Sequence, residues 1–180
     1  MTGQRAGRPR PAVVAALVVA VCVAVTGCGG KKQKAAPPTT TRYPPTQPVQ
    51  NEQISEGTGA CALLSESEIN GVVGVAVNPG SGTRTKTSES CRWTARAGSN
   101  QFVAVIVAPA GRQLFERAQN ELGAAVEQLP GIADRAFVAN DTAYALKGER
   151  LVIVEVSTSQ GVPARKQAAT KLITGAVGRG

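Results

Sequence analysis

The chain has 180 residues, enough for one globular domain and short for two. Only 3% of the residues are aromatic and none is histidine, which excludes Ser-His-Asp and Cys-His catalytic groups. The formal net charge is +8, but the sequence has no clustered basic face with aromatic or helical readers, so no nucleic-acid partner is expected.

Residues 1–27 are predicted to be a signal peptide. Arg5, Arg8 and Arg10 form a positive segment, and an almost uninterrupted apolar run over residues 12–26 follows it. A run of about 15 residues spans roughly 22 Å as a helix, whereas the hydrocarbon core of a membrane is about 30 Å thick. The segment is therefore predicted to be a leader that is removed, and not a permanent membrane span.

The leader ends in Val25-Thr26-Gly27-Cys28, which resembles the lipobox of bacterial lipoprotein precursors. The resemblance implies cleavage before Cys28, a diacylglycerol thioether on its thiol, and further acylation of the freed amine. Two or three acyl chains at ~0.8 kcal/mol per buried methylene would give lasting attachment. The expected location is the extracytoplasmic face of the cell membrane, with membrane lipid as a partner. The alternative is an ordinary thiol at Cys28 behind a secretory signal.

A disordered tether is predicted for residues 28–59. This segment is rich in proline, threonine and lysine, and it has no apolar period of 2 or 3.6, so no face is available for burial. The proline density favours polyproline II, a semi-rigid spacer at ~3.1 Å per residue. Its basic residues beside Cys28 are expected to meet anionic head groups.

Residues 60–180 are predicted to form one domain with a disulfide. Cys61 and Cys91 are the cysteines that remain once Cys22 leaves with the leader and Cys28 carries lipid. Two thiols in an exported domain favour a bridge, worth about 3–4 kcal/mol for a loop of about 30 residues. The alternatives are two free buried thiols or a metal pair, although two sulfurs without histidine suit zinc poorly. No metal and no cofactor is expected.

The first half of this domain is predicted to contain a short helix, two strands and a longer helix. Ser65 and Glu68 have the spacing of a capping box, and glycines at 71 and 74 are expected to end the helix. Alternating apolar residues predict a strand over 91–96. The run over 101–108 is apolar on both sides, which predicts a central strand covered on each face. An amphipathic helix is expected over 111–129.

The second half is predicted to contain three short strands, over 136–139, 142–146 and 151–156, and a last helix that begins at Pro163. A helix precedes a hairpin in both halves, which suggests an α-β-β-β unit used twice and closed by a C-terminal helix. The expected fold class is α+β, with an antiparallel or mixed sheet packed with helices.

Three segments carry a resemblance to a known family: Cys61-Ala62-Leu63-Leu64, Cys91-Arg92-Trp93 and residues 130–137. Together they look like a family of actinobacterial cell-envelope lipoproteins whose C-terminal domain has no assigned function. In the third segment this chain has Ala133 where the family usually has glycine. The resemblance implies a surface lipoprotein with a disulfide, and it implies no chemistry.

The sequence contains no recognisable catalytic motif. Ser-x-x-Lys is absent, and the glycine pairs near 71 and 80 are too short for phosphate loops. Asp134 and Asp141 are a candidate acid pair, but the chain has few aromatic platforms for sugar. The expected function is a non-catalytic binding or accessory module of the cell envelope, with a lipid, glycan or protein partner. The alternatives are a structural scaffold and, less favoured, a carboxylate-based hydrolase.

Whether the domain contains a pocket, an exposed apolar patch or a cleft is expected to distinguish these functions. An apolar pocket between sheet and helices, large enough for an acyl chain, would favour a lipid. A filled core with an exposed apolar patch would favour a protein. A cleft with converging carboxylates of perturbed pKa would favour an enzyme.

Overall fold

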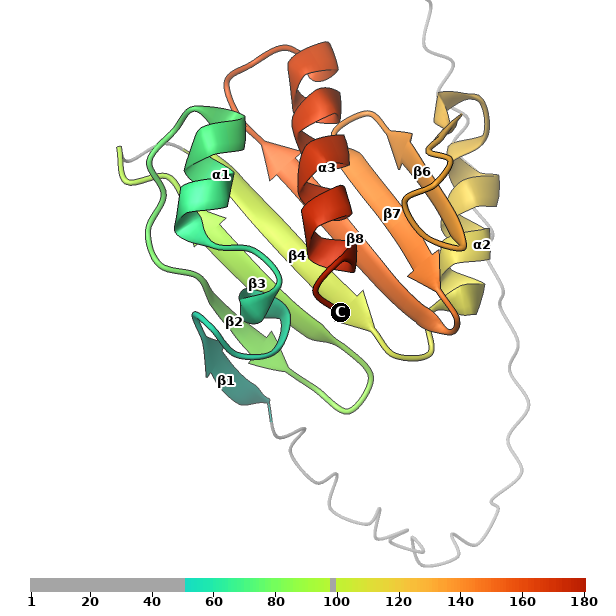
Figure 1. The fold of residues 1–180 in the computed structure, drawn as a ribbon, viewed down its shortest axis with the longest axis horizontal. Coiled ribbons are helices and arrows are strands. Elements are labelled where there is room, and N and C mark those ends of the chain that lie inside the picture. Colours follow the sequence, from blue (N-terminus) through green and yellow to red (C-terminus); the bar gives the residue numbers. More distant parts are fainter. Residues whose placement is uncertain (1–50, 98–99) are drawn as a thin grey trace, which may run out of the picture. The chain divides into compact units, whose positions relative to one another are not determined.

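The computed structural model describes residues 51–97 and 100–180, which form one eight-stranded antiparallel sheet with three α-helices (Figure 1). The strand order is β1-β2-β3-β4-β8-β7-β6-β5. This arrangement confirms the α+β class. The predicted leader, Cys28 and most of the predicted tether lie outside the described residues. The elements are β1 (Glu52–Ser55), the 3-10 turn η1 (Gly59–Ala62), α1 (Glu66–Val73), β2 (Ser81–Arg84), β3 (Glu89–Thr94), β4 (Phe102–Ala108), α2 (Arg112–Leu122), the 3-10 turn η2 (Gly123–Ala125), β5 (Glu127–Gln128), β6 (Arg135–Ala139), β7 (Thr142–Lys147), β8 (Arg150–Ser157) and α3 (Val162–Val177).

The sheet consists of two similar halves that meet at its centre. The order α1-β2-β3-β4 is followed by α2, the two-residue strand β5, and β6-β7-β8, and α3 closes the chain. The last strands of the two halves, β4 and β8, pair along their whole length, from Phe102 opposite Ser157 to Ala108 opposite Leu151. The expected repetition of an α-β-β-β unit agrees with this order in part, because the second half has the additional strand β5 and the helices α1 and α2 pack on opposite faces of the sheet.

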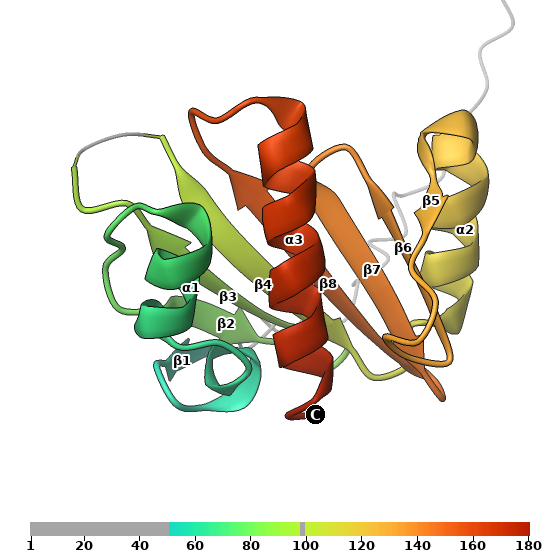
Figure 2. The same ribbon diagram turned by 45° about the horizontal axis from the view of Figure 1, so that its top comes forward.

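Helices α1 and α3 cover one face of the sheet and enclose the main core (Figure 2). Every second residue of the two central strands points into this core and is at most 5% exposed: Val103, Val105, Val107, Val152, Val154 and Val156. Helix α3 contributes buried side chains at helical spacing: Ala168, Ala169, Leu172, Ile173, Ala176 and Val177. Because aromatic residues are few, aliphatic side chains fill this core, apart from Trp93, which is 0% exposed.

The predicted disulfide between Cys61 and Cys91 is confirmed. It joins η1 to β3 across 30 residues, with the two Cα atoms 5.1 Å apart, and both cysteines are buried. The chain passes close over it at Gly80, where a Cβ atom would lie 2.6 Å from the Trp93 ring and 2.9 Å from the sulfur of Cys91. Residue 80 therefore needs to be glycine for the chain to cross the bridge at this point.

The predicted capping box at the start of α1 is confirmed. Ser65 Oγ accepts a hydrogen bond from the backbone of Glu68, and the Glu68 carboxylate accepts one from the Ser65 backbone at 3.0 Å. Gly74 ends the helix in the left-handed conformation, with φ of 71°. Gly71, which was also expected to end the helix, lies within it.

The long helix expected over 111–129 ends earlier, and that prediction is wrong for residues 123–129. Helix α2 stops at Leu122, Gly123 takes a φ of 46°, and a 3-10 turn leads into β5. The apolar residues with helical spacing do not all pack on the same surface: Phe115 and Leu122 pack on one face of the sheet, and Leu129 packs on the other. The spacing alone does not show on which face of the sheet each residue packs.

The predicted tether boundary at residue 59 is also wrong. Residues Glu52–Ser55 form β1, which pairs with β2 and buries Ile54. Strand β2 itself was not expected, because glycine and serine in this segment indicated a loop. Among the helices of the described part of the chain, none combines the length and the apolar character that a membrane span requires.

Candidate functional site

The face of the sheet opposite α1 and α3 is covered at one end alone. Helix α2 lies against this face near β6, β7 and the start of β8, where Phe115 meets Phe137 edge to face with ring centroids 5.0 Å apart (Figures 1 and 2). The last outward residue of β4, Ala108, is buried in the cluster beneath α2. None of the described elements covers β3 and the rest of β4 on this face, where Phe102, Ala104 and Ile106 are half-buried. The prediction that β4 is covered on both faces therefore holds at Ala108 and is wrong for the rest of the strand in the described chain.

We call the uncovered surface of three neighbouring strands the open face. It is made by the outward side chains of β3, β4 and β8: Ser90, Arg92, Thr94, Phe102, Ala104, Ile106, Glu155 and Ser157, with Ile153 at its edge, where it packs against the cluster beneath α2. The register places them in three rows across the strands, and Arg92, Ala104 and Glu155 form the middle row. The open face is thus apolar along β4 and polar on both sides of it.

Arg92 lies flat on an aromatic ring at one side of the open face. Its guanidinium carbon is 3.5 Å from the centroid of the Phe102 ring, within the range of a cation–π contact. Stacking of this kind occupies one flat face of the guanidinium and leaves its N–H edge free to donate. The side chain is exposed, and among the described residues it has no carboxylate partner.

Glu155 lies on the other side of Ala104 and is half-buried. Within the described part of the chain its carboxylate forms no ion pair and no side-chain hydrogen bond. The negative charge of Glu155 helps to raise the pKa of Tyr144 of β7. Burial is the largest cause of this rise, followed by the charges of Glu155 and Asp141. Tyr144 therefore remains a neutral phenol at neutral pH, stacked on Phe137 with centroids 4.6 Å apart.

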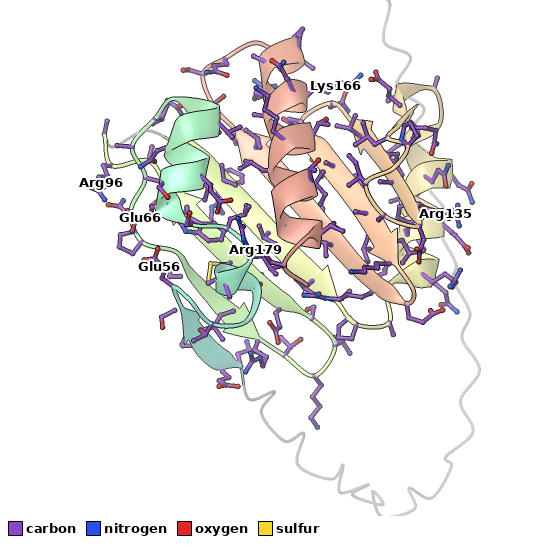
Figure 3. All side chains as sticks on the ribbon, in the orientation of Figure 1. Glu56, Glu66, Arg96, Arg135, Lys166 and Arg179 are labelled. Atoms are coloured by element: carbon purple, nitrogen blue, oxygen red, sulfur yellow. A yellow bond between two sulfur atoms is a disulfide. The ribbon has the colours of Figure 1, made fainter. Side chains whose placement is uncertain are left out.

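Most other charges of the domain are paired at its periphery (Figure 3). Arg96 binds Glu66 of α1 at 2.9 Å, Arg135 of β6 binds Glu116 of α2 at 3.3 Å, and Lys166 of α3 binds Glu127. Pairs as exposed as these contribute at most about 1 kcal/mol each. Arg92 and Glu155 are among the charges without an ion-pair partner in the described chain, and what sets them apart is that they carry opposite signs in one row of the same open face.

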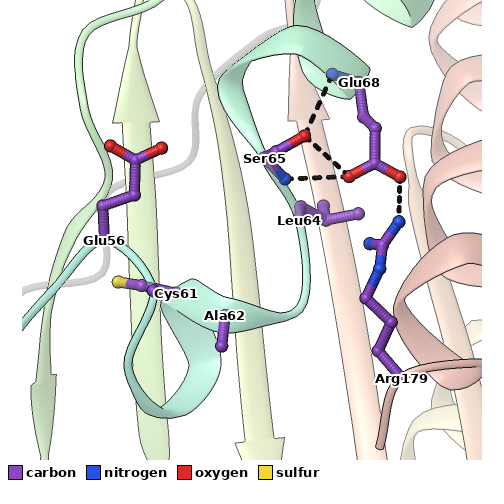
Figure 4. A pocket seen from close by; sticks show the side chains of 8 residues that line it. Glu56, Cys61, Ala62, Leu64, Ser65, Glu68 and Arg179 are labelled. Atoms are coloured by element: carbon purple, nitrogen blue, oxygen red, sulfur yellow. Dashed lines mark hydrogen bonds and ion pairs between the residues drawn. The ribbon is translucent and has the colours of Figure 1, made fainter.

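A surface pocket of about 520 Å³ lies beside the start of α1 (Figure 4). Its walls include Glu56, Cys61, Ser65, Glu68 and Arg179. One carboxylate oxygen of Glu68 accepts from Ser65 and the other accepts from Arg179, whose hydrogen bond is the main reason that the pKa of Glu68 is lowered. Because both oxygens are used, this carboxylate holds α1 to the end of α3 and offers no free acid or base.

Two further pockets bear on lipid binding. A groove of about 600 Å³ lies between β5 and α3, but it is on the surface, and the Glu127–Lys166 pair lies in its wall. The pocket beside Val73 and Val103, at the edge of the main core, measures about 10 Å³, which is room for one water. The core between the sheet and the helices α1 and α3 is otherwise filled with side chains. The described pockets give no support to an acyl-chain site in the interior.

Asp134 and Asp141 are separated, and the interpretation of this pair as catalytic acids is wrong. They lie on either side of β6, so an extended strand of five residues stands between them. That span of roughly 20 Å exceeds the ~5–9.5 Å between the carboxylates of glycosidases. Asp134 accepts from the backbone of Gly148 at 2.7 Å, and Asp141 pairs with Arg165 at 3.4 Å. Asp134 thus supports the β7–β8 turn.

Comparison with protein families gives one match. A model described as "Protein of unknown function (DUF3558)" covers residues 23–177. The chain belongs to this family. The DUF3558 match runs from the end of the predicted leader through Cys28 to the end of α3, and it agrees with the expected resemblance to a domain without assigned function. No curated protein and no solved structure matches the chain.

Of the three cysteines predicted as site residues in this DUF3558 chain, two lie in the described part of the structure. Cys61 and Cys91 are together in the disulfide, and Cys28 lies outside the described residues. Among the described residues, no three His, Cys, Asp or Glu side chains gather as a metal site would require. Neither Arg92 nor Glu155 belongs to a pattern that predicts a surface site from the sequence. The available signal was that β4 is apolar at every position, on both of its faces.

Proposed function

We propose that this DUF3558 protein is a membrane-anchored extracytoplasmic lipoprotein whose domain is a non-catalytic module that binds another polypeptide of the cell envelope. The observation that carries the proposal is the open face. It joins an apolar centre of Phe102, Ala104 and Ile106 to polar residues on both sides, on a domain whose core is filled. An apolar centre with a polar rim is the usual composition of a protein-binding surface.

The shape of this face favours a protein over a small ligand. Small molecules and acyl chains bind in concave pockets that enclose most of their surface, whereas the open face is the flank of three neighbouring strands. The carboxylates also favour a binding role, because the two candidate acids are at opposite ends of β6 and the pKa of Glu68 is lowered by its pairing with Arg179. A general acid at neutral pH requires a raised pKa.

The anchor supports a location outside the cytoplasm. The lipobox resemblance ends at Cys28, and the domain begins by β1 at Glu52. The intervening proline-rich residues would reach roughly 70 Å at ~3.1 Å per residue, which would hold the domain clear of the lipid head groups. The disulfide agrees with an oxidising compartment.

In-cell photocrosslinking tests the binding surface. A photoreactive amino acid is placed at Ala104 of the open face in the full chain, and a matched one at Lys171, an exposed residue of α3 on the opposite side. We expect a protein adduct from position 104 that mass spectrometry can identify, and none from position 171. Equal labelling from both positions, or none from position 104, would contradict the proposal.

Cell fractionation tests the anchor. We expect Cys28→Ser to release the protein from the membrane fraction, because the acyl chains are lost. Cys22→Ser is the matched control, since this residue would leave with the leader and its loss should change nothing. Retention of Cys28→Ser in the membrane, or reduced Cys61 and Cys91 in cells, would exclude the lipoprotein assignment.

A further inference from the structure

The open face is complementary to itself in charge. Arg92 and Glu155 occupy the same row across the sheet, on β3 and β8, with Ala104 of β4 between them. At a strand spacing of ~4.8 Å, each charge is about one strand to either side of β4. Neither has an ion-pair partner among the described residues, although most of the carboxylates of the domain do.

Arg92 and Glu155 lie on opposite sides of β4. If a second copy is related to the first by a two-fold axis that runs along β4, just above the open face, these residues form two ion pairs between the copies. Rotation about that axis carries Arg92 of one copy to a position over Glu155 of the other copy, and the reverse. The apolar side chains of β4 would then meet their own counterparts on the axis, with the small Ala104 at the middle. Such self-complementarity is what an isologous contact requires.

We propose that the open face binds a second copy of this chain, sheet against sheet, with the pair Arg92–Glu155 formed twice. This inference rests on the binding role proposed above and names its partner. Two aligned sheets pack ~10 Å apart, and the small residues Ser90, Thr94, Ala104 and Ser157 permit that approach. Because α2 covers the β6 end of the same face, the contact is confined to the neighbourhood of β3, β4 and β8.

The expected contact is small. Three strands of about five residues fall in the size class of weak, transient interfaces, below ~1,200 Å² in total. The dimer is therefore expected to dissociate on dilution and to form where anchoring to one membrane raises the local concentration of the copies. Stacking on Phe102 restricts Arg92 in advance, which lowers the entropy lost on binding.

The test uses the full chain in its own envelope with Ala104→Cys and a thiol-to-thiol cross-linker of about 10 Å, because residue 104 lies on the proposed axis and would face its own copy across sheets that pack ~10 Å apart. We expect a cross-linked dimer on a denaturing gel, and none from Lys171→Cys. Adding Arg92→Glu or Glu155→Arg should lower the dimer at least five-fold, because each change places like charges opposite each other. Arg92→Gln, which removes attraction without adding repulsion, should lie between these variants and the parent.

The decisive arm co-expresses the two charge variants with different tags. A copy with Arg92→Glu paired with a copy with Glu155→Arg again has two ion pairs, one in the original sense and one reversed, so the mixed dimer should return although neither variant forms its own. A misfolded variant could not be rescued in this way. Single variants that cross-link as well as the parent, or a mixture that fails to recover, would overturn the inference.

Two outcomes separate this inference from the proposed function. If position 104 cross-links to a different protein and not to itself, the face is a binding surface and the second copy is the wrong partner. If it cross-links to nothing, both the dimer and the binding role fail.

Discussion

Glu68 of α1 binds Arg179, the second residue after the end of α3. One carboxylate thus serves the capping box at the start of the first helix and holds the last residues of the chain. Arg179 also donates to the backbone oxygen of Leu63, so the segment before α1 is held at two points. The hydrogen bond from Arg179 is the largest cause of the lowered pKa of Glu68, and burial acts against it.

This pair predicts a pH-dependent contribution to stability. Because the pKa of Glu68 is lowered on folding from its ordinary 4.5, its contribution is complete above that value and is lost as pH falls through the folded pKa. Glu68→Gln should lower the free energy of unfolding by about 0.5–1 kcal/mol at pH 7, since the side chain is partly exposed, and by almost nothing at pH 2. Urea titrations at both pH values measure this, with exposed Glu121→Gln as control. An equal loss at both pH values would contradict it.

The disulfide predicts a large loss on removal. Replacing Cys61 and Cys91 together by alanine should lower the free energy of unfolding by about 3–4 kcal/mol, because the unfolded chain regains the freedom of a 30-residue loop. Chemical denaturation of the double variant measures this. Unfolding of the parent in the presence of a reductant should approach the double variant, and a parent insensitive to reductant throughout its unfolding transition would count against the argument.

Two neighbouring residues of α2 are expected to contribute very differently to the free energy of unfolding. Phe115 is 1% exposed and packs on Phe137, whereas Leu114 is 47% exposed. Phe115→Ala should cost about 3–4 kcal/mol through the cavity it leaves, and Leu114→Ala should cost less than about 0.5 kcal/mol. Thermal melts of both variants provide the measurement. Similar melting temperatures for the two would show that α2 does not pack as described.

Two glycines predict changes of opposite sign on conversion to alanine. Gly71 lies within α1, and a Cβ atom added there would have no other atom within 4 Å, so Gly71→Ala should stabilise by about 0.5–1 kcal/mol. At Gly111 a Cβ would lie 2.1 Å from the Cβ of Leu151, so Gly111→Ala should destabilise by about 1–3 kcal/mol. Denaturant midpoints test both, and a stabilised Gly111→Ala would refute the close packing of α2 on β8.

Local signals in the sequence predicted most of the domain. The capping box of Ser65 and Glu68, the proline near the start of α3 and the alternation of β7 and β8 each depend on neighbours a few residues apart. The pair of thiols predicted the disulfide from the compartment and from elimination. These features need no knowledge of which element packs on which.

Two of the failures, at the end of α2 and on the outer face of β4, share one cause, which is that apolar spacing does not say which surface a residue will meet. The spacing from Phe115 to Leu129 is helical, but those two side chains belong to opposite faces of the sheet. In β4 the outward residues are as apolar as the inward ones, and only the position of α2 decides that Phe102 and Ile106 stay uncovered. The Arg92–Glu155 row depends on the pairing of β3, β4 and β8, which no local pattern contains.

The central pairing of β4 with β8 has a consequence for how this protein folds. Neither half owns a complete sheet, because the inner edge of each is satisfied only by the last strand of the other. The two strands are separated along the chain by α2 and three strands, so the costly closure of that long loop comes before the central ladder can form. We therefore expect slow, all-or-none folding, in which the innermost strand of the first half gains its second neighbour only once β8 is available.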